Sequence, residues 1–486
     1  MSYAWRVLSA TTPGIALAGL NTSTMDVALP SVARHFDASP TEASWILLSY
    51  LLVNTAFILV LGRLADIVGR RVLYLSGLVL FAVAGLLCGL APSAGWLIAL
   101  RAVQAVGAAA VITNVIALLA DTFPPRLLST ALGINTTAVS TTQLVGPLVG
   151  GALVETFGWR AAFWFNVPVA AAGVLWAARI LRRAPPRSGP REPFDLAGAA
   201  LSTLALAALV LALSLGPSSG WLSAPVLVPG AGFVVLMVVF VLAERRPYPL
   251  LDLRLLADRE RSLAFVAAFL TAASRFSVVL LMALYLQAAG SHNALEAALQ
   301  VTPAAVGLAG ASLVSGHLAR RLGARVLASA GLFTIMVGLC ALALFTDPGF
   351  TGLPLAGCLL AIGIGTGLFL TPNTSAIMVS VRPDQRGVAN GLRSALQNSG
   401  FVVGTALSLA IVTSWLSQEE KRAAYAGTLS RLTGDSLAGL TTGYRVAFAT
   451  MAAVCALALV ASLLRNPPPA GGERPRAADG GHRAVA

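Results

Sequence analysis

The chain has 486 residues, of which 57% are hydrophobic and only 11% are charged, and its formal net charge is +13. Soluble proteins carry about 25% charged residues, so this composition excludes an ordinary soluble domain. It is typical of a protein that crosses a membrane many times, since each crossing needs roughly 20 mostly apolar residues.

Apolar segments of this length follow one another along the whole chain, and they predict an all-α polytopic membrane protein with fourteen spans. The predicted spans are 11–33, 44–63, 72–92, 95–119, 129–153, 161–182, 196–216, 225–243, 262–287, 296–316, 326–346, 353–380, 388–415 and 443–464.

The basic residues are distributed unevenly over the gaps between these spans. Alternate gaps, together with both termini, contain most of the 33 Lys and Arg residues. The positive-inside rule therefore predicts that both termini are cytoplasmic. The many Arg, Ala and Gly residues beside a single Lys suggest a GC-rich bacterial genome, so we expect a bacterial inner membrane. Because topology explains the basic excess, we expect no nucleic-acid partner.

Two related halves are predicted from a repeat. GRLADIVGRR (62–71) follows the second predicted span, and GHLARRLGAR (316–325) follows the tenth. Duplicated bundles are common in transporters. The predicted units are a six-helix bundle over 1–183, a linker with two inserted spans over 184–260, a second six-helix bundle over 261–465, and a disordered tail over 466–486.

Two opposite charges stand at similar depth in the predicted N-terminal bundle. Asp26 lies roughly 10 Å below the outer boundary in the first span, and Arg101 lies at about the same depth in the fourth. Ionisable residues inside a membrane are costly and are functional candidates. We expect the two to face each other and to couple protonation to transport. A fixed ion pair that only joins helices is the structural alternative.

Arg275 lies near the middle of the ninth span, among apolar and small residues. As the counterpart of the first span, this helix would turn Arg275 toward a central cavity, where it attracts an anionic group or exchanges contacts with Asp26. The alternative is an arginine satisfied by backbone carbonyls. Polar residues of later spans, among them Asn373, Gln397 and Asn398, line that cavity or join helices.

The loop GRLADIVGRR predicts a conformational switch. Gly62 allows close helix approach, and Asp66 accepts hydrogen bonds at a helix N-terminus, where its charge is favoured. Arg70 and Arg71 pair with Asp66 across one turn and hold the cytoplasmic face in one conformational state. Plain positive-inside anchoring is the alternative.

The fifth span, TTQLVGPLVGGALVETFGW, combines Gly146, Pro147, Gly150 and Gly151. These residues predict a helix that bends and approaches a neighbour closely. Close packing alone also explains the glycines. The four cysteines and four histidines show no metal-ligand spacing, so we expect no metal site and no cofactor.

These motifs resemble the major facilitator superfamily. GRLADIVGRR is similar to its signature loop, LIALRAVQAVGAAA (97–110) to its fourth-span motif, and QLVGPLVGGAL to its fifth-span antiporter motif. With LNTSTMDVALP (20–30) and WRAAFWFNVP (159–168), fourteen spans resemble the drug/proton antiporters of the EmrB/QacA type. The resemblance implies two six-helix bundles plus two inserted spans.

Two departures from that family pattern affect the expected site. Asn21 stands where the family places an acid in the first span, and Asp26 stands where it has an asparagine. The resemblance therefore implies that Asp26 carries the proton and that Asn21 faces the cavity. In the thirteenth span, Gln397 and Asn398 replace an Arg-Gln pair. With Arg275, these departures make a neutral or anionic substrate as plausible as a cation.

The resulting expectation is a proton-coupled exporter of antibiotic-like small molecules that works by alternating access. Its partners are a small-molecule substrate, protons and the lipid bilayer, and it functions as a monomer. Proton-linked uptake or export of a metabolite is the alternative within transport. A membrane receptor or integral-membrane enzyme is the alternative of another class, but no cluster of catalytic residues appears at membrane depth.

Overall fold

The structure is a computed structural model that describes residues 2–182, 195–244, 256–289, 292–381, 386–426 and 434–465. Within these residues every regular element is a helix, so the all-α class is confirmed. The residues outside the described part include 183–194 and 245–255, on either side of the predicted pair of inserted spans, and 466–486, the predicted tail.

The described helices form three groups along the chain. The first group is α1 (Tyr3–Phe36), α2 (Pro40–Val68), α3 (Arg70–Cys88), α4 (Ala94–Thr122), α5 (Pro125–Phe157), α6 (Ala161–Trp164) and α7 (Asn166–Ile180). A pair follows, α8 (Leu196–Ser219) and α9 (Ala224–Ala243). The last group is α10 (Arg259–Arg275), α11 (Val278–Ala288), α12 (Ala294–Leu322), α13 (Ala324–Phe345), α14 (Leu353–Val379), α15 (Arg386–Thr413), α16 (Gln418–Tyr425) and α17 (Gly434–Leu463).

Each predicted span overlaps a described helix or a pair of them. By length and composition, twelve segments of the described chain could cross a membrane, and α1 and α5 are not among them. The fourteen-span count therefore stays a prediction. Two predicted spans are not continuous helices: 161–182 is interrupted at Phe165, and 262–287 is interrupted at Phe276 and Ser277.

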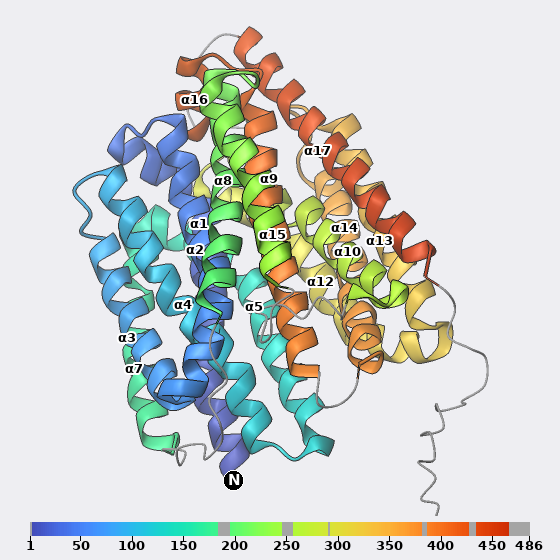
Figure 1. Cartoon of the computed structure of the whole chain (residues 1–486). Coiled ribbons are helices and arrows are strands. Elements are labelled where there is room, and N and C mark those ends of the chain that lie inside the picture. Colours follow the sequence, from blue (N-terminus) through green and yellow to red (C-terminus); the bar gives the residue numbers. More distant parts are fainter. Residues whose placement is uncertain are drawn as a thin grey trace, which may run out of the picture.

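The helices pack as two groups with a pair between them (Figure 1). Helices α1 to α7 contact mainly one another, as do α10 to α17, and the groups meet chiefly where α5 packs on α12 and α2 on α15. The α8–α9 pair contacts both groups through α8.

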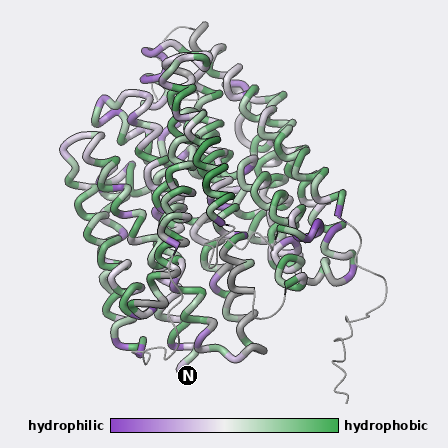
Figure 2. Tube along the Cα trace, in the orientation of Figure 1, coloured by the Kyte–Doolittle hydropathy of each residue, from purple (hydrophilic) through white to green (hydrophobic). Residues whose placement is uncertain are grey.

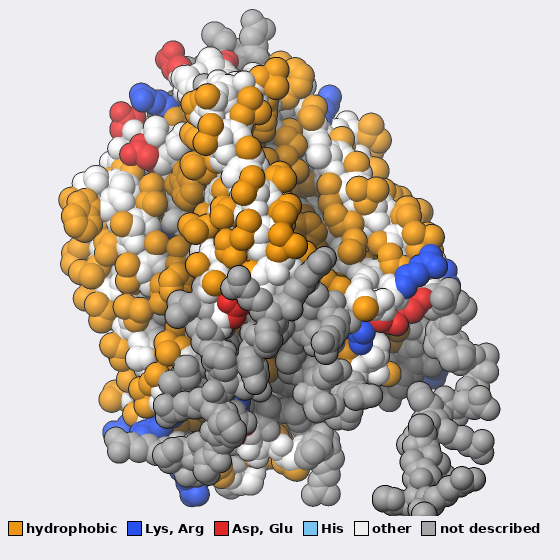
Figure 3. Space-filling view, viewed as in Figure 1, with side chains coloured by type: hydrophobic (Ala, Val, Ile, Leu, Met, Phe, Trp, Pro, Cys, Tyr) orange, Lys and Arg blue, Asp and Glu red, His pale blue; other side chains and the backbone are white. Residues whose placement is uncertain are grey.

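Figure 2 shows hydrophobic residues along the middle of the helices, and Figure 3 shows charged side chains toward the two ends of the visible face. This surface is that expected of a protein surrounded by lipid.

The repeated loop has the same geometry in both groups. Gly69, before α3, and Gly323, before α13, both have positive φ, at 101° and 84°, a conformation that glycine adopts readily. Arg71 donates to the Ala178 carbonyl in the last turn of α7, at 3.0 Å. Its counterpart, Arg325, donates to the carbonyl of Leu463, the last residue of α17. In each group, the loop arginine thus binds carbonyl oxygens that a helix end leaves without intrahelical partners.

The two groups are joined at the end of the bundle farthest from the N-terminus. Gln287 of α11 donates to the Val27 carbonyl of α1 at 3.3 Å, and the hydroxyls of Ser44 in α2 and Tyr425 in α16 lie 2.8 Å apart. Burial raises the pKa of Tyr425 to about 12, so this hydroxyl is neutral at physiological pH. One buried core cluster includes residues of both groups here. This end of the bundle is closed.

Helix α16 contributes to this closure. It lies in the stretch 416–442 between the last two predicted spans and begins with a capping box, in which Ser417 and Glu420 satisfy each other's backbone N–H groups. Its side chains Lys421 and Tyr425 are buried, and the helix contacts α1, α2 and α11. It therefore packs against the bundle, although the rest of the stretch includes residues outside the described part.

Candidate functional site

A cavity of about 250 Å³ lies between the two groups of helices. It is lined from the first group by residues of α1, α2, α4 and α5, and from the last group by Arg275, Phe276, Val279, Asn398 and Phe401. Its α1 residues run from Ile15 to Asp26, so it begins just on the N-terminal side of the Val27 contact that closes the bundle. Both groups thus supply walls to one space, as a site between moving halves requires.

Asp26 is the acidic side chain among the described residues of this cavity wall, and it is half-buried. No hydrogen bond or ion pair of its carboxylate is found within the described part of the chain. Pro30 follows four residues later inside α1. Because proline has no N–H, the helix bond to the Asp26 carbonyl is missing, and α1 can bend at this level.

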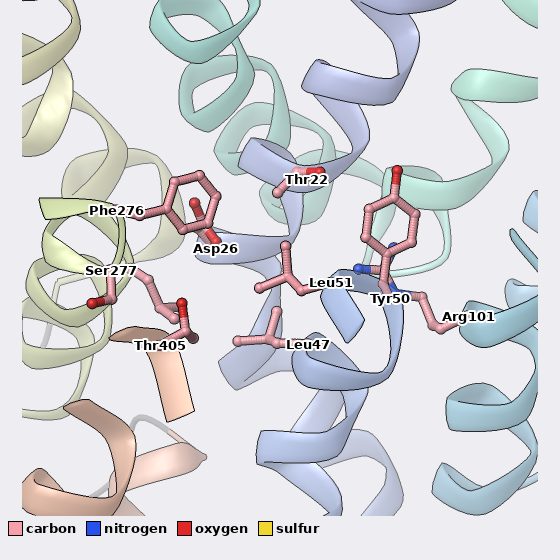
Figure 4. A pocket seen from close by; sticks show the side chains of 10 residues that line it. Thr22, Asp26, Leu47, Tyr50, Leu51, Arg101, Phe276, Ser277 and Thr405 are labelled. Atoms are coloured by element: carbon pink, nitrogen blue, oxygen red, sulfur yellow. The ribbon is translucent and has the colours of Figure 1, made fainter. Parts of the chain in front are cut away.

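Arg101 lies in a small pocket that also contains Asp26, but its direct partners are elsewhere (Figure 4). Its side chain is 1% exposed. Its Nε donates to the Ile46 carbonyl of α2 at 3.2 Å, and Nη1 donates to Gln104 at 3.2 Å. The Tyr50 ring lies 4.4 Å from the guanidinium carbon. Within the described residues, no ion pair joins Arg101 to Asp26, so the two share a pocket without direct contact.

Arg275 is the last residue of α10, at the break before α11. Its Nε is buried and has no hydrogen-bond acceptor in the described part of the chain, and its side chain lines the central cavity. The next residue, Phe276, stacks on Phe401 of α15 with ring centroids 3.9 Å apart and planes 20° apart. The helix break therefore places a guanidinium beside a stacked aromatic pair on one cavity wall.

The predicted cavity residues divide into two sets. Arg275 and Asn398 line the cavity, whereas Asn21, Asn373 and Gln397 are not among its described lining residues. Asn21 is buried and accepts a long bond from Asn166 of α7, at 3.5 Å. Asn373 binds the Ala264 carbonyl at 3.1 Å and accepts from Arg465 at 2.9 Å. Gln397 accepts from Arg393, at 2.6 Å. These three join helices or residues within one group.

The predicted switch loop contacts the neighbouring helix α4. Arg70 forms an ion pair with Asp121 and donates to the Ala117 carbonyl at 2.9 Å. A methyl group added at Gly62 would lie 3.0 Å from the Thr113 side chain, so α2 and α4 approach closely here. The Asp66 side chain lies outside the described residues, and its pairing with Arg70 and Arg71 stays a prediction.

The glycines of α5 contact two different helices. A Cβ at Gly150 would lie 2.9 Å from the Thr24 Cα of α1, and Gly146 faces Ser23 on the same helix. At Gly151 a Cβ would lie 2.8 Å from the Ala294 carbonyl oxygen and the Leu295 Cα of α12. Pro147 lies inside the helix. Thus α5 contacts the cavity helix α1 on one side and the opposite group on the other.

Comparisons with known proteins identify the family. The model of the Major Facilitator Superfamily matches residues 11–405 and, in a second match, 264–486. The chain belongs to the major facilitator superfamily. It is 34% identical to the multidrug resistance protein Stp of Mycobacterium tuberculosis (strain CDC 1551 / Oshkosh) over 84% of this chain and 76% of that protein. It is 33% identical to the cephamycin export protein CmcT of Amycolatopsis lactamdurans over 92% of this chain and 91% of that protein.

Two further comparisons extend this result. The methylenomycin A resistance protein of Bacillus subtilis (strain 168) is 30% identical over 82% of this chain and 85% of that protein. A bacterial homolog of the human lysosomal transporter Spinster, solved in an inward-facing and unoccupied conformation, has the same fold, with a TM-score of 0.67. The match covers 97% of this chain and 100% of that chain, at 18% sequence identity. The chain is therefore a multi-pass membrane transport protein and not an enzyme.

Several side chains of the transporter's site had no role in the sequence-based prediction. Tyr50 and Asn54, one helical turn apart in α2, both line the cavity, as do Phe276 and Phe401. Their spacing of four residues places Tyr50 and Asn54 on one helix face. This spacing is the feature of the sequence from which they could have been found. Nothing in the sequence predicted that Phe276 would stack on Phe401, because the stacking depends on the break in the ninth span.

No group of three or more possible metal ligands is found among the described residues of the transporter. Its four cysteines are free, and two of them, Cys88 and Cys455, are buried in the helix bundle.

Proposed function

We propose that this transporter exports antibiotic-like small molecules by alternating access, and that inward proton flow drives the export. The observation that carries the proposal is the central cavity, whose walls come from both helix groups and which is closed at one end by contacts between them. A protein that alternates between two such closures moves a bound molecule across the membrane without forming an open channel.

The structure corresponds to the inward-facing state in this proposal. The positive-inside rule places the termini in the cytoplasm, so the closed end near Val27 and Gln287 is the outer one. The relatives support the direction of transport, since their names describe export of, or resistance to, antibiotics. We assign the chain to the fourteen-span drug/proton antiporters, acting as a monomer in the bacterial inner membrane.

Asp26 carries the proton in this mechanism. Its carboxylate lines the cavity and has no hydrogen-bond partner within the described ranges, so water, a proton or a substrate group can reach it. Arg101 lies in the same pocket and is fixed by Ile46 and Gln104. The ionised carboxylate is attracted to this guanidinium, and protonation removes the attraction. Protonation from the more acidic outer side therefore loosens α1 from α2 and α4 and permits the return movement.

Inside-out membrane vesicles test the direction of transport. We would impose an acidic lumen and measure accumulation of a panel of cationic, neutral, anionic and amphoteric antibiotics. We expect accumulation of at least one class, lost when an ionophore collapses the gradient and absent from vesicles that lack the protein. Gradient-dependent accumulation only in right-side-out vesicles would instead show uptake and contradict the proposal.

A further inference from the structure

The cavity contains two opposite charges, Asp26 and Arg275, that come from opposite helix groups and have no hydrogen-bond or ion-pair partner among the described residues. We propose that the transported substrate is amphoteric, with a cationic amine that binds Asp26, an anionic group that binds Arg275, and a flat apolar body that packs on Phe276 and Phe401. This inference rests on the proposed export function and defines the substrate class of the same cavity.

The guanidinium of Arg275 lacks an acceptor among the described residues. Its Nε is buried without an acceptor, and within the described residues no hydrogen bond or ion pair of its guanidinium is found. A buried guanidinium that lacks a counter-charge is costly. The planar group presents paired donors that match a carboxylate or phosphate in bidentate fashion. Because the side chain lines the cavity, an anionic group of the substrate can supply the missing acceptor.

The carboxylate of Asp26 is the second of these charges. A cationic amine and a proton both neutralise this carboxylate, so the two compete for it, and this competition is what exchange of drug for proton requires. A substrate with an anionic group alone would behave differently. Its charge would favour the protonated form of Asp26, so proton and substrate would bind together and move in the same direction. An amine on the substrate restores the competition.

The aromatic pair provides an apolar part of the cavity wall. Phe276 and Phe401 stack at the cavity wall immediately after Arg275, and Figure 4 shows Phe276 on the same side of the pocket as Asp26. Aromatic faces prefer offset stacking with further rings. A ring between the two charges would therefore contact this pair. The cavity of about 250 Å³ lies near the lower end of the range for small-molecule sites, which favours a compact molecule.

Polar amides complete the wall on both sides. Asn54 of α2 and Asn398 of α15 line the cavity from opposite groups, and each offers both hydrogen-bond donors and an acceptor. They can bind neutral polar atoms of an amphoteric molecule without contributing a charge. The described wall therefore has one negative and one positive side chain, and its charges are balanced by a substrate that also carries one of each.

Three charge forms of one fluorescent scaffold test the inference. Norfloxacin carries an amine and a carboxylate on an aromatic ring system, N-acetylnorfloxacin keeps only the acid, and norfloxacin methyl ester keeps only the amine. We would measure binding by fluorescence to the purified full-length protein. We expect the wild type to bind norfloxacin about tenfold more tightly than either derivative, since each derivative leaves one buried charge unpaired.

Variants assign each group to its residue. Arg275→Gln should bring norfloxacin and its methyl ester to within about threefold of each other, because the acid then has no partner. Asp26→Asn should do the same for norfloxacin and N-acetylnorfloxacin. Arg34→Gln, which changes an exposed arginine at the closed end of α1, should leave both ratios unchanged.

Equal binding of norfloxacin and its methyl ester to the wild type, absence of norfloxacin binding, or an unchanged ratio in Arg275→Gln would overturn the inference. The proposed export function fails in a different way. If norfloxacin binds with the expected charge preference but is not accumulated by inside-out vesicles, the amphoteric site stands and export is contradicted.

Discussion

At the scale of single residues, the proposed mechanism gives Arg101 a positioning role and Asp26 the proton. The guanidinium is fixed by the Ile46 carbonyl, Gln104 and the Tyr50 ring, all within the first helix group. Asp26 lies in the same pocket, and no ion pair of its carboxylate is found among the residues that the structure describes. Arg101 thus provides a positive charge at a fixed place, while the protonation state of Asp26 can change. A direct ion pair would instead hold both groups in one state.

Arg101→Lys tests this positioning role. Lysine keeps the charge but has a compact ammonium that cannot bind the Ile46 carbonyl and Gln104 while lying flat over Tyr50. Hydrogen bonds to charged groups contribute about 1.5–3 kcal/mol, so we expect drug-driven proton exchange to fall about tenfold or more while the protein still folds. Arg160→Lys, at an arginine over Trp159, is the control. A fully active Arg101→Lys protein would show that charge alone is sufficient.

The sequence indicates which side chains are candidates here, but not what they contact. Asp26, Arg101 and Arg275 can be found because charges are rare in apolar segments. The partners of Arg101 could not be predicted, because Ile46 and Tyr50 come from another helix, about 50 residues earlier in the chain. The position of Asn373 shows the same limit. Its amide suggested a cavity, yet its partner is Arg465, a residue beyond the end of α17.

At the scale of helices, α5 connects the cavity to the contact between the groups. Gly150 approaches the backbone of α1, and Gly151 approaches the backbone of α12 at the closed end. The glycine-rich motif of the fifth span predicted a close approach to one neighbouring helix. The structure shows close approaches to two helices, α1 and α12. The break between α10 and α11 was not predicted, because its residues Arg275, Phe276 and Ser277 include neither glycine nor proline.

Gly151→Ala should weaken the closed state. The added methyl would lie 2.8 Å from backbone atoms of α12, which cannot move aside cheaply. Overpacking costs about 1–3 kcal/mol, and 1.4 kcal/mol corresponds to about tenfold in population. With Asn398→Cys as a cavity reporter in a protein whose native cysteines are replaced by serine, labelling by an impermeant thiol reagent from the outer side should rise about tenfold.

A matched glycine controls for the loss of glycine itself. Gly310 lies in α12 with no atom near the position of an added Cβ, so Gly310→Ala should leave the labelling rate of Asn398→Cys unchanged. Equal labelling rates in Gly151→Ala and Gly310→Ala would contradict the claim that the contact between α5 and α12 holds the outer end closed.

At the scale of the whole molecule, the duplicated loop and the packing of the helices agree. Arg71 and Arg325 occupy equivalent positions in the repeat, and each binds a carbonyl near the end of the last helix of its group. The helices and the duplicated loop could be predicted well from the sequence, because the repeat and the hydrophobic segments are local patterns. The sequence could not predict which end of the bundle is closed, since that depends on contacts such as Gln287 with Val27.

We propose that Asp26 exchanges a proton for a bound drug, and proton flux in proteoliposomes that contain a pH-sensitive dye tests this directly. We would impose a pH gradient, add norfloxacin, and compare the wild type, Asp26→Asn and Asp37→Asn, with protein-free liposomes as the background. Asp37 is an exposed acid at the end of α1. We expect drug-triggered dissipation of the gradient in the wild type and in Asp37→Asn, and its loss in Asp26→Asn. Dissipation that persists in Asp26→Asn at the wild-type rate would contradict it.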